Sequence, residues 1–266
     1  MPFWESAAEK NQREAQEATR KALEQGKIPP HARHRLQQQR QQNQGFFTSD
    51  LTSNEHLLTR EAGYEPLGLV MGTAFYKISF WGYFNSYRTV TGELTNLSQA
   101  QLAARELAID RLRQEAQLLG AHGVIGVRLQ LGGYDWSAQT VEFTAIGTAI
   151  RIPGRPPDPR PFTSDLSGQE FRQLYQAGYY PRGLVLGICS YYVHTDWDTR
   201  NMMRGGFWGR GSSQNQEIAS YTQGFQLARH LASQRLTADI RKHGGEGAVG
   251  MHIDRKSTRL NSSHRT

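Results

Sequence analysis

The feature that most constrains this chain is an internal repeat. The stretch FTSDLTSNEHLLTREAGYEPLGLVMG begins at Phe47, and FTSDLSGQEFRQLYQAGYYPRGLVLG begins at Phe162. The two stretches align at a shift of 115 residues, and further matches follow at a shift of 124, such as Arg105 with Arg229. Matches in this order indicate an internal duplication. The sequence therefore predicts two tandem units, over residues 47–152 and 162–253.

Each predicted unit begins with a strand and continues with one long helix. Residues 67–78 alternate bulky with small side chains, which is typical of a strand. Ser98 and Gln101 predict a capping box at the start of the helix, and alanines and leucines then recur every four residues until Gly120 ends it. Two further strands, ending with residues 141–152, complete the unit.

These elements predict an α+β fold made of two tandem α/β sandwich units, each a small, mostly antiparallel sheet with one long helix. Apolar residues lie on both faces of strand 141–152, so the sheet needs a second covering layer from the sister unit or another chain. Residues 153–161 are proline-rich and predict a semi-rigid linker. Residues 1–46 predict a helical, Gln-rich N-terminal arm, which we expect to be peripheral or partly disordered because it has few large apolar residues.

Residues 254–266 do not fit the repeat. The sequence from Asp254 to His264, DRKSTRLNSSH, resembles a translated sequencing adapter, and no counterpart of strand 141–152 follows Ile253. We interpret residues 254–266 as a non-native tail and expect the second unit to be truncated at its C-terminus, lacking its last strand.

Charge and apolar content disfavour nucleic acid and membrane as partners. The net charge is +7, but residues 1–46 and 254–266 carry about +3 each, which leaves the body nearly neutral. No stretch has the roughly 18 apolar residues that a membrane span needs, and the N-terminus lacks the apolar core of a signal peptide. A cytoplasmic location is therefore expected. The single cysteine excludes an internal disulfide.

The repeated motifs resemble the YbjQ-like family, which is often described as "putative heavy-metal-binding". The resemblance rests on the strand motif G-L-V-x-G, the helix AARELAIDRLRQEAQLLGAHGVIGVRLQ and the closing strand VEFTAIGTAIRI. It covers residues 47–152 completely and 162–253 in part. It implies an α+β sandwich, and it implies a ring-forming oligomer in which one chain supplies two units. No metal-ligand motif of the family matches this sequence.

One group of side chains in the second unit has the chemistry of a metal site. If the strand there continues, alternation places His194, Asp196 and Asp198 on one side, with Cys189 earlier on the same strand. Nitrogen, oxygen and sulfur ligands of this kind suit a divalent heavy metal. The alternative is a solvated strand end with Cys189 packed as a small apolar side chain. No other cofactor is identified.

Two loops, over residues 75–87 and 191–208, combine aromatic side chains with arginines. Such loops can stack nucleotide bases, or they can form the centre of a protein–protein interface. Because the body is nearly neutral, we favour the interface. The residues predicted to form it are Trp81, Tyr83, Phe84, Trp197, Phe207 and Trp208.

No catalytic residue is predicted. The glycines of Gly120-x-x-Gly123-x-x-Gly126 follow a helix and lead into a strand, the reverse of a dinucleotide-binding turn. We therefore expect, first, a non-enzymatic assembly or binding module that forms a ring-like homo-oligomer. The second hypothesis is a heavy-metal-binding protein with its site in the second unit. The third is an enzyme with a site at the unit boundaries.

Overall fold

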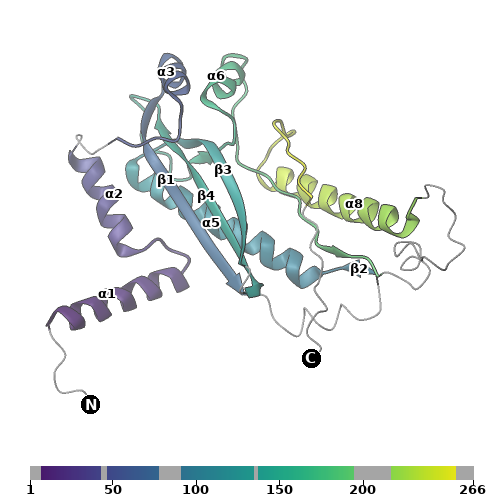
Figure 1. The fold of residues 1–266 in the computed structure, drawn as a ribbon. Coiled ribbons are helices and arrows are strands. Elements are labelled where there is room, and N and C mark those ends of the chain that lie inside the picture. Colours follow the sequence, from purple (N-terminus) through teal and green to yellow (C-terminus); the bar gives the residue numbers. More distant parts are fainter. Residues whose placement is uncertain (1–6, 43–46, 78–90, 135–136, 195–216, 256–266) are drawn as a thin grey trace, which may run out of the picture.

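The fold is mixed α+β (Figure 1). The computed structural model describes residues 7–42, 47–77, 91–134, 137–194 and 217–255. The helices of this part are α1 (Ala7–Glu24), α2 (Pro30–Gln42), α3 (Ser53–Glu61), α5 (Thr95–Leu119), α6 (Gly168–Gln176) and α8 (Ala219–Lys242). The strands are β1 (Glu65–Lys77), β2 (Gly92–Glu93), β3 (Gly123–Tyr134), β4 (Ser137–Arg151), β5 (Phe162–Thr163) and β6 (Tyr191–Tyr192).

A four-stranded sheet in the order β1-β4-β3-β5 forms the centre of the molecule. Strands β1, β4 and β3 are antiparallel, and β1 pairs with β4 from Glu65 opposite Arg151 to Lys77 opposite Thr140, with a shift of register between Pro66 and Gly68. Strand β5 pairs parallel with β3, at Gly123 and Val124. The first residues of the second predicted unit therefore extend the sheet of the first.

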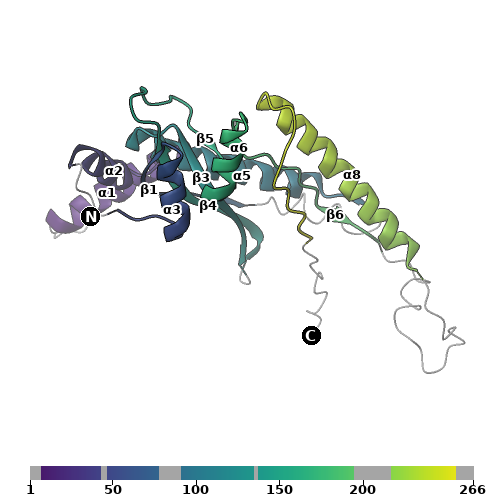
Figure 2. The same ribbon diagram turned by 90° about the horizontal axis from the view of Figure 1, so that it is seen from above.

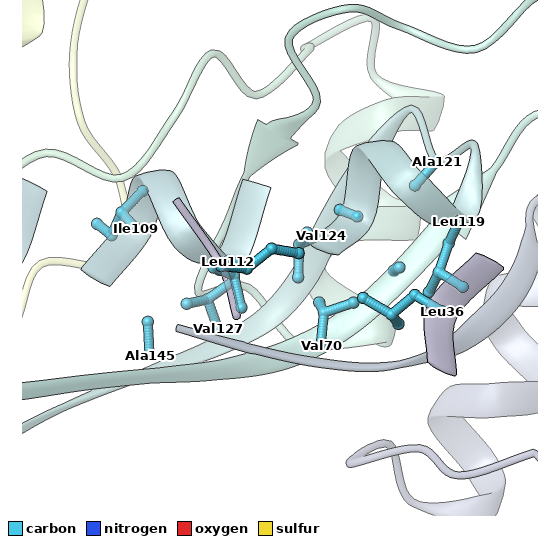
Figure 3. Packing of buried hydrophobic residues seen from close by; sticks show 12 residues of the cluster. Leu36, Val70, Ile109, Leu112, Leu119, Ala121, Val124, Val127 and Ala145 are labelled. Carbon is cyan, nitrogen blue, oxygen red and sulfur yellow. The ribbon is translucent and has the colours of Figure 1, made fainter. Parts of the chain in front are cut away.

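Helix α5 packs on one face of this sheet, as its four-residue period predicts. Leu112 and Ala116 are fully buried against Val124 and Ala145 (Figure 3). The helix ends at Gly120, whose backbone has the left-handed φ of 77° and whose N–H bonds to Ala116 O. The period was readable because a buried helical face needs apolar side chains at regular spacing.

Helices α3 and α6 lie side by side at one end of the sheet, where they cover part of its other face (Figure 1). Phe171 of α6 is buried against Tyr64, Ile125 and Ile150. Each helix starts with a capping box, formed by Thr52 and Glu55 in α3 and by the equivalent Ser and Glu in α6. The second layer that the apolar sheet requires thus includes a helix from the second predicted unit.

The N-terminal arm is packed more closely than its composition suggests. Ile28, Ala32 and Leu36 are buried, and Figure 3 shows Leu36 beside Val70 and Leu119. This part of the arm therefore buries more than we expected, whereas the side chains of α1 are almost all exposed. These three apolar residues are few, but their four-residue spacing places them together on one side of the arm, facing the first predicted unit.

Residues 162–253, the second half, do not form a sheet of their own within the described residues. Their strands β5 and β6 pair with β3 and β2, which belong to residues 47–152, the first half. The prediction of a separate sheet in each unit is therefore not met. Two backbone groups between Leu184 and Ser190 bond to side chains of α8: Leu186 N–H donates to Asp239, and Ile188 O accepts from Arg235.

The described helices also bear on membrane association. None of them has an apolar stretch that is long enough to cross a bilayer.

Candidate functional site

Arg105 of α5 is a buried charge that joins the two halves. Its side chain is 4% exposed, and its Nη1 lies 3.1 Å from Asp239 Oδ2 on α8. Its Nη2 donates to Leu184 O at 2.6 Å. Burial lowers the pKa of Arg105, and the neighbouring Asp239 carboxylate opposes that shift. Removing one partner of such a buried pair typically costs about 3–5 kcal/mol, because the other charge stays buried and unpaired.

The segment from Leu184 to Ser190 lies between α5 and α8. Ser190 N–H donates to Ser98 Oγ, and Ser190 Oγ donates to Gln101 Oε1, both at 2.9 Å. Helix α5 begins at Thr95, so Ser98 and Gln101 lie inside the helix and do not form the predicted capping box. We call this set of groups the internal contact: Ser98, Gln101 and Arg105 on α5, with Leu184, Ser190 and Asp239 opposite.

Backbone pairing beside β3 strengthens the join between the halves. Phe162 N–H donates to His122 O at 3.1 Å, and Ser164 N–H donates to Val124 O at 2.9 Å. His122 is itself buried, and its ring bonds to Ile152 N and to a carbonyl of the linker. It is thus a core histidine with both ring nitrogens hydrogen-bonded.

The strand-to-helix packing of the first half recurs in the second. A Cβ atom at Gly72 would collide with Ala108 O, and one at Gly187 would collide with Ala232 O. The glycines are 115 residues apart and the alanines 124, which are the two shifts of the sequence repeat. In both halves, the chain approaches the helix so closely that only glycine fits.

A carboxylate on each long helix binds the backbone in the same way. Met71 N–H donates to Glu115 Oε2 at 2.9 Å, and Leu186 N–H donates to Asp239 Oδ2 at 3.0 Å. These pairs also obey the shifts of 115 and 124. Sequence reasoning missed both carboxylates, although a charge at the same place on an otherwise apolar helical face in both repeats was the signal.

The two carboxylates differ in the arginine that faces them. Asp239 has the buried Arg105, whereas Glu115 has Arg35 of α2, which lies 3.8 Å away and is 67% exposed. The Glu115 side chain is 7% exposed, and burial raises its pKa, although Met71 N–H and Arg35 oppose that shift. Gln39 of α2 also donates to Leu67 O at 3.2 Å. Helix α2 therefore supplies the arginine that faces the carboxylate of the first half, as α5 supplies the one that faces the carboxylate of the second.

Helix α8 has an exposed face that corresponds to the α5 side of the internal contact. Tyr221, Phe225 and Arg229 are spaced by four residues and are all exposed, the two aromatics at 41% and 42%. Arg229 follows Arg105 by 124 residues, and it pairs with no carboxylate among the described residues. The arm and α8 lie at opposite ends of the molecule (Figures 1 and 2).

The described residues contain half of the predicted metal site. Cys189 is half-buried, and burial and then Glu93 raise the pKa of its thiol. His194 is also half-buried, and its backbone N–H donates to Thr91 Oγ1. Asp196 and Asp198 lie outside the described residues. No group of three His, Cys, Asp or Glu side chains that could hold a metal occurs in the part the structure describes, so this donor set does not make a complete site there.

The predicted aromatic interface residues all lie outside the described ranges: Trp81, Tyr83, Phe84, Trp197, Phe207 and Trp208. A shallow hollow of about 320 Å³ occurs between α1 and α2 and includes Lys21, Arg33 and His34. Its lining side chains are mainly cationic or amide groups, and no nucleophile contacts a base there. The hollow lies on the arm, away from the boundary between the halves.

Comparisons with known proteins identify the family. A family model described as "Putative heavy-metal-binding" matches residues 52–153. A Mycobacterium tuberculosis protein named "encapsulin nanocompartment protein" is 35% identical over 212 residues, which cover 78% of this chain and 77% of that protein. The chain belongs to the YbjQ (UPF0145) family.

Two UPF0145 relatives are shorter than this chain. The UPF0145 protein of Enterococcus faecalis is 31% identical over 104 residues, which are 38% of this chain and 95% of that protein. The UPF0145 protein of Halorubrum lacusprofundi is 34% identical over 111 residues, 39% of this chain and 98% of that protein. Each of these relatives matches a stretch of about the size of one predicted unit.

Proposed function

We propose that this YbjQ-family protein is a non-enzymatic assembly module whose chains associate head to tail by repeating the internal contact between chains. One observation carries the proposal. The internal contact joins two different surfaces, Arg105 on α5 and the Asp239 carboxylate, and the chain carries a counterpart of each at its two ends. Those counterparts are Arg229 on α8 and Glu115 beside β1.

The proposal treats the two halves as tandem copies of one unit. The recurring glycine and carboxylate contacts support this, together with the sequence repeat. A contact between two different surfaces is head-to-tail, and it produces a closed ring when its rotation closes. A ring-like homo-oligomer is therefore the expected product. The name of the Mycobacterium relative, which refers to a nanocompartment, is consistent with a role in an assembly.

The exposed surface of the second half has the composition of an interface. Tyrosine, phenylalanine and arginine on one helical face are typical of residues that dominate binding energy. Val249, Met251 and Ile253 are also exposed, at 64%, 56% and 79%. At a shift of 124, the first two correspond to Ile125 and Val127, which are buried in the first half. We include in the proposed interface the aromatic residues of the two loops: Trp81, Tyr83, Phe84, Trp197, Phe207 and Trp208.

Native mass spectrometry over a concentration series tests this function. We expect the wild-type chain to form oligomers, and Arg229→Glu to weaken association about 100-fold or more, because a carboxylate would then face Glu115. Arg241→Glu is the matched control, since Arg241 is exposed on the same helix and has no counterpart in the internal contact. A wild-type chain that stays monomeric at every concentration, or equal behaviour of the two variants, would overturn the proposal.

The second candidate function is binding of a divalent heavy metal. The observation that favours it is the His194 Nδ1 atom, which is buried without a hydrogen-bond partner among the described residues. The proposed ligands are Cys189, His194, Asp196 and Asp198. Calorimetric titration with Zn²⁺, Ni²⁺ and Cu²⁺ tests it, with His194→Ala as the comparison. Equal heats for the wild type and His194→Ala would exclude this site.

A further inference from the structure

Helix α2 binds the first half at the groups that a second chain would need. Glu115 accepts from Met71 N–H through Oε2, and its Oε1 faces Arg35 of α2 at 3.8 Å. Asp239 is in the same position in the second half, and Arg105 of α5 faces it. Helix α2 thus holds, through Arg35, the carboxylate that the proposed head-to-tail contact would give to Arg229 of another chain.

The ion pair that α2 makes with Glu115 is weaker than the ion pair of the internal contact. Arg35 is 67% exposed and 3.8 Å from its carboxylate, whereas Arg105 is 4% exposed and 3.1 Å from its own. An exposed ion pair contributes little and is screened by salt. By contrast, an arginine that is buried on binding forms short, charge-assisted bonds. Arg229 of a second chain, buried against Glu115 as Arg105 is buried against Asp239, would thus bind Glu115 more strongly than Arg35 does.

Apolar burial and further hydrogen bonds also hold the arm on the first half: Gln114 Nε2 donates to Gly26 O at 3.0 Å, and Arg111 Nη2 donates to Leu23 O at 3.1 Å. Ile28 and Leu36 are buried beside α5, and Ile28 N–H donates to Gln114 Oε1 at 3.2 Å. These contacts keep α2 in place on an isolated chain. Because the Glu115 side chain is only 7% exposed under α2, a second arginine reaches it only when the helix moves away.

We propose that α2 is an internal cap on the head end of the molecule and that it competes with α8 of a second copy of this chain for Glu115. This inference rests on the proposed function. Association through Glu115 then requires the open form of the arm, so the apparent dissociation constant is the intrinsic one divided by the open fraction. Any change that loosens α2 tightens the association of chains, and salt also loosens the Arg35 contact.

A charge reversal on α2 of the full chain tests the cap. In Arg35→Glu, the exposed ion pair is replaced by a repulsion with Glu115, so we expect the apparent dissociation constant between chains to fall about 2- to 10-fold. Arg33→Glu is the matched control, because Arg33 is exposed on the same helix and pairs with no carboxylate among the described residues. Analytical ultracentrifugation over a concentration series gives both constants. Adding Arg229→Glu to Arg35→Glu should abolish the gain.

The outcomes separate this inference from the function on which it rests. If the wild-type chain associates but Arg35→Glu and Arg33→Glu have equal constants, α2 is not a cap and the assembly function stands. If no variant associates, both ideas fail together. Hydrogen exchange gives a second readout on the unmodified chain. We expect the amides of α2 to lose protection when the chains associate, and unchanged or greater protection of α2 would contradict the cap.

Discussion

At the scale of single residues, two largely buried carboxylates organise the molecule. Asp239 ties the segment after Leu184 to α8 and receives Arg105 from the other half. Glu115 ties β1 to α5 and is covered by the arm. A buried carboxylate is costly unless it is paired, so each position favours a partner arginine. Asp239 therefore has two roles: it binds Leu186 N–H within the second half, and it pairs with Arg105 of the first half.

The buried state of Glu115 predicts a dependence of stability on pH. Burial raises its pKa in the folded chain above the value in the unfolded chain. Its contribution to the free energy of unfolding is therefore full below the unfolded pKa and falls as pH rises through the folded pKa. Glu115→Gln keeps an acceptor for Met71 N–H but does not titrate. We expect its free energy of unfolding, relative to wild type, to increase between about pH 4 and pH 7.

Urea denaturation of dilute protein at both ends of that range measures this difference. If the wild type instead gains stability over Glu115→Gln as the pH rises, the ionised carboxylate is favoured in the folded chain, and the description of Glu115 as a desolvated group is wrong.

The recurring glycines give a second prediction at this scale. A methyl group at Gly72 or Gly187 would collide with the backbone of the long helix, so Gly72→Ala and Gly187→Ala should each lower the free energy of unfolding by about 1–3 kcal/mol. Gly92→Ala is the control, since a Cβ there meets no atom within 4 Å, and it should change stability by less than about 0.5 kcal/mol. Thermal and urea unfolding report both values. A Gly187→Ala chain as stable as the control would show that the second half lacks this close packing.

At the scale of elements, α6 packs on the sheet of the first half and so attaches the second half to it. It buries Phe171 against residues of the sheet and of the turn after α3. Among the described residues, helix α8 packs on β6 and on the segment from Leu184 to Ser190. The internal contact and the ion pairs of Arg235 with Glu93 and of Lys242 with Glu106 join it to the first half. The two helices of the second half thus depend on the first half in different ways.

Truncation of Phe171 tests the docking of α6. The side chain is 1% exposed, so Phe171→Ala should lower the free energy of unfolding by about 3–5 kcal/mol through lost burial and a cavity. Tyr179→Ala, with a side chain that is 67% exposed, serves as the comparison and should stay within about 0.5 kcal/mol of wild type. Similar effects of the two substitutions would mean that α6 does not pack as described.

Local patterns in the sequence predicted the elements of the first half well. The alternation over residues 67–78 corresponds to β1, and the four-residue period ending at Gly120 corresponds to α5. Each of those patterns arises because one face of a single strand or helix is buried, so it can be recognised within a short stretch of sequence. The second half has the same local pattern without a sheet, because pairing depends on which strand is adjacent. Ser98 illustrates the limit: it looked like a helix cap, but it accepts from Ser190, which is 92 residues away.

The site was less predictable than the fold. Arg105 and Arg229 were visible as a repeated pair, but nothing local distinguishes a buried arginine from an exposed one. The structure supplies that distinction, since Arg105 faces Asp239 and Arg229 faces no carboxylate among the described residues. The predicted ligands Asp196 and Asp198 lie outside the described residues, and the metal site therefore stays a prediction.

At the scale of the whole molecule, the structure is directional. The arm, which covers Glu115, and helix α8 lie at opposite ends of the molecule (Figure 2). Helix α8 carries the exposed aromatic residues and Arg229. Within the chain, the internal contact already joins an arginine surface, on α5 of the first half, to a carboxylate surface, at Asp239 of the second half. If chains repeat this contact with one another, each chain offers one arginine surface, at Arg229, and one carboxylate surface, at Glu115. One chain that lacks the arginine surface and another that lacks the carboxylate surface should therefore still form one contact together.

Mixing two complementary variants tests this claim most directly. Arg229→Glu lacks the arginine surface, and Glu115→Gln lacks the carboxylate that an incoming arginine needs. We expect native mass spectrometry to show monomers for each variant alone and a one-to-one pair for the mixture, which stops there because no second matched surface remains. A mixture that stays monomeric, or either variant alone forming oligomers like the wild type, would contradict head-to-tail association.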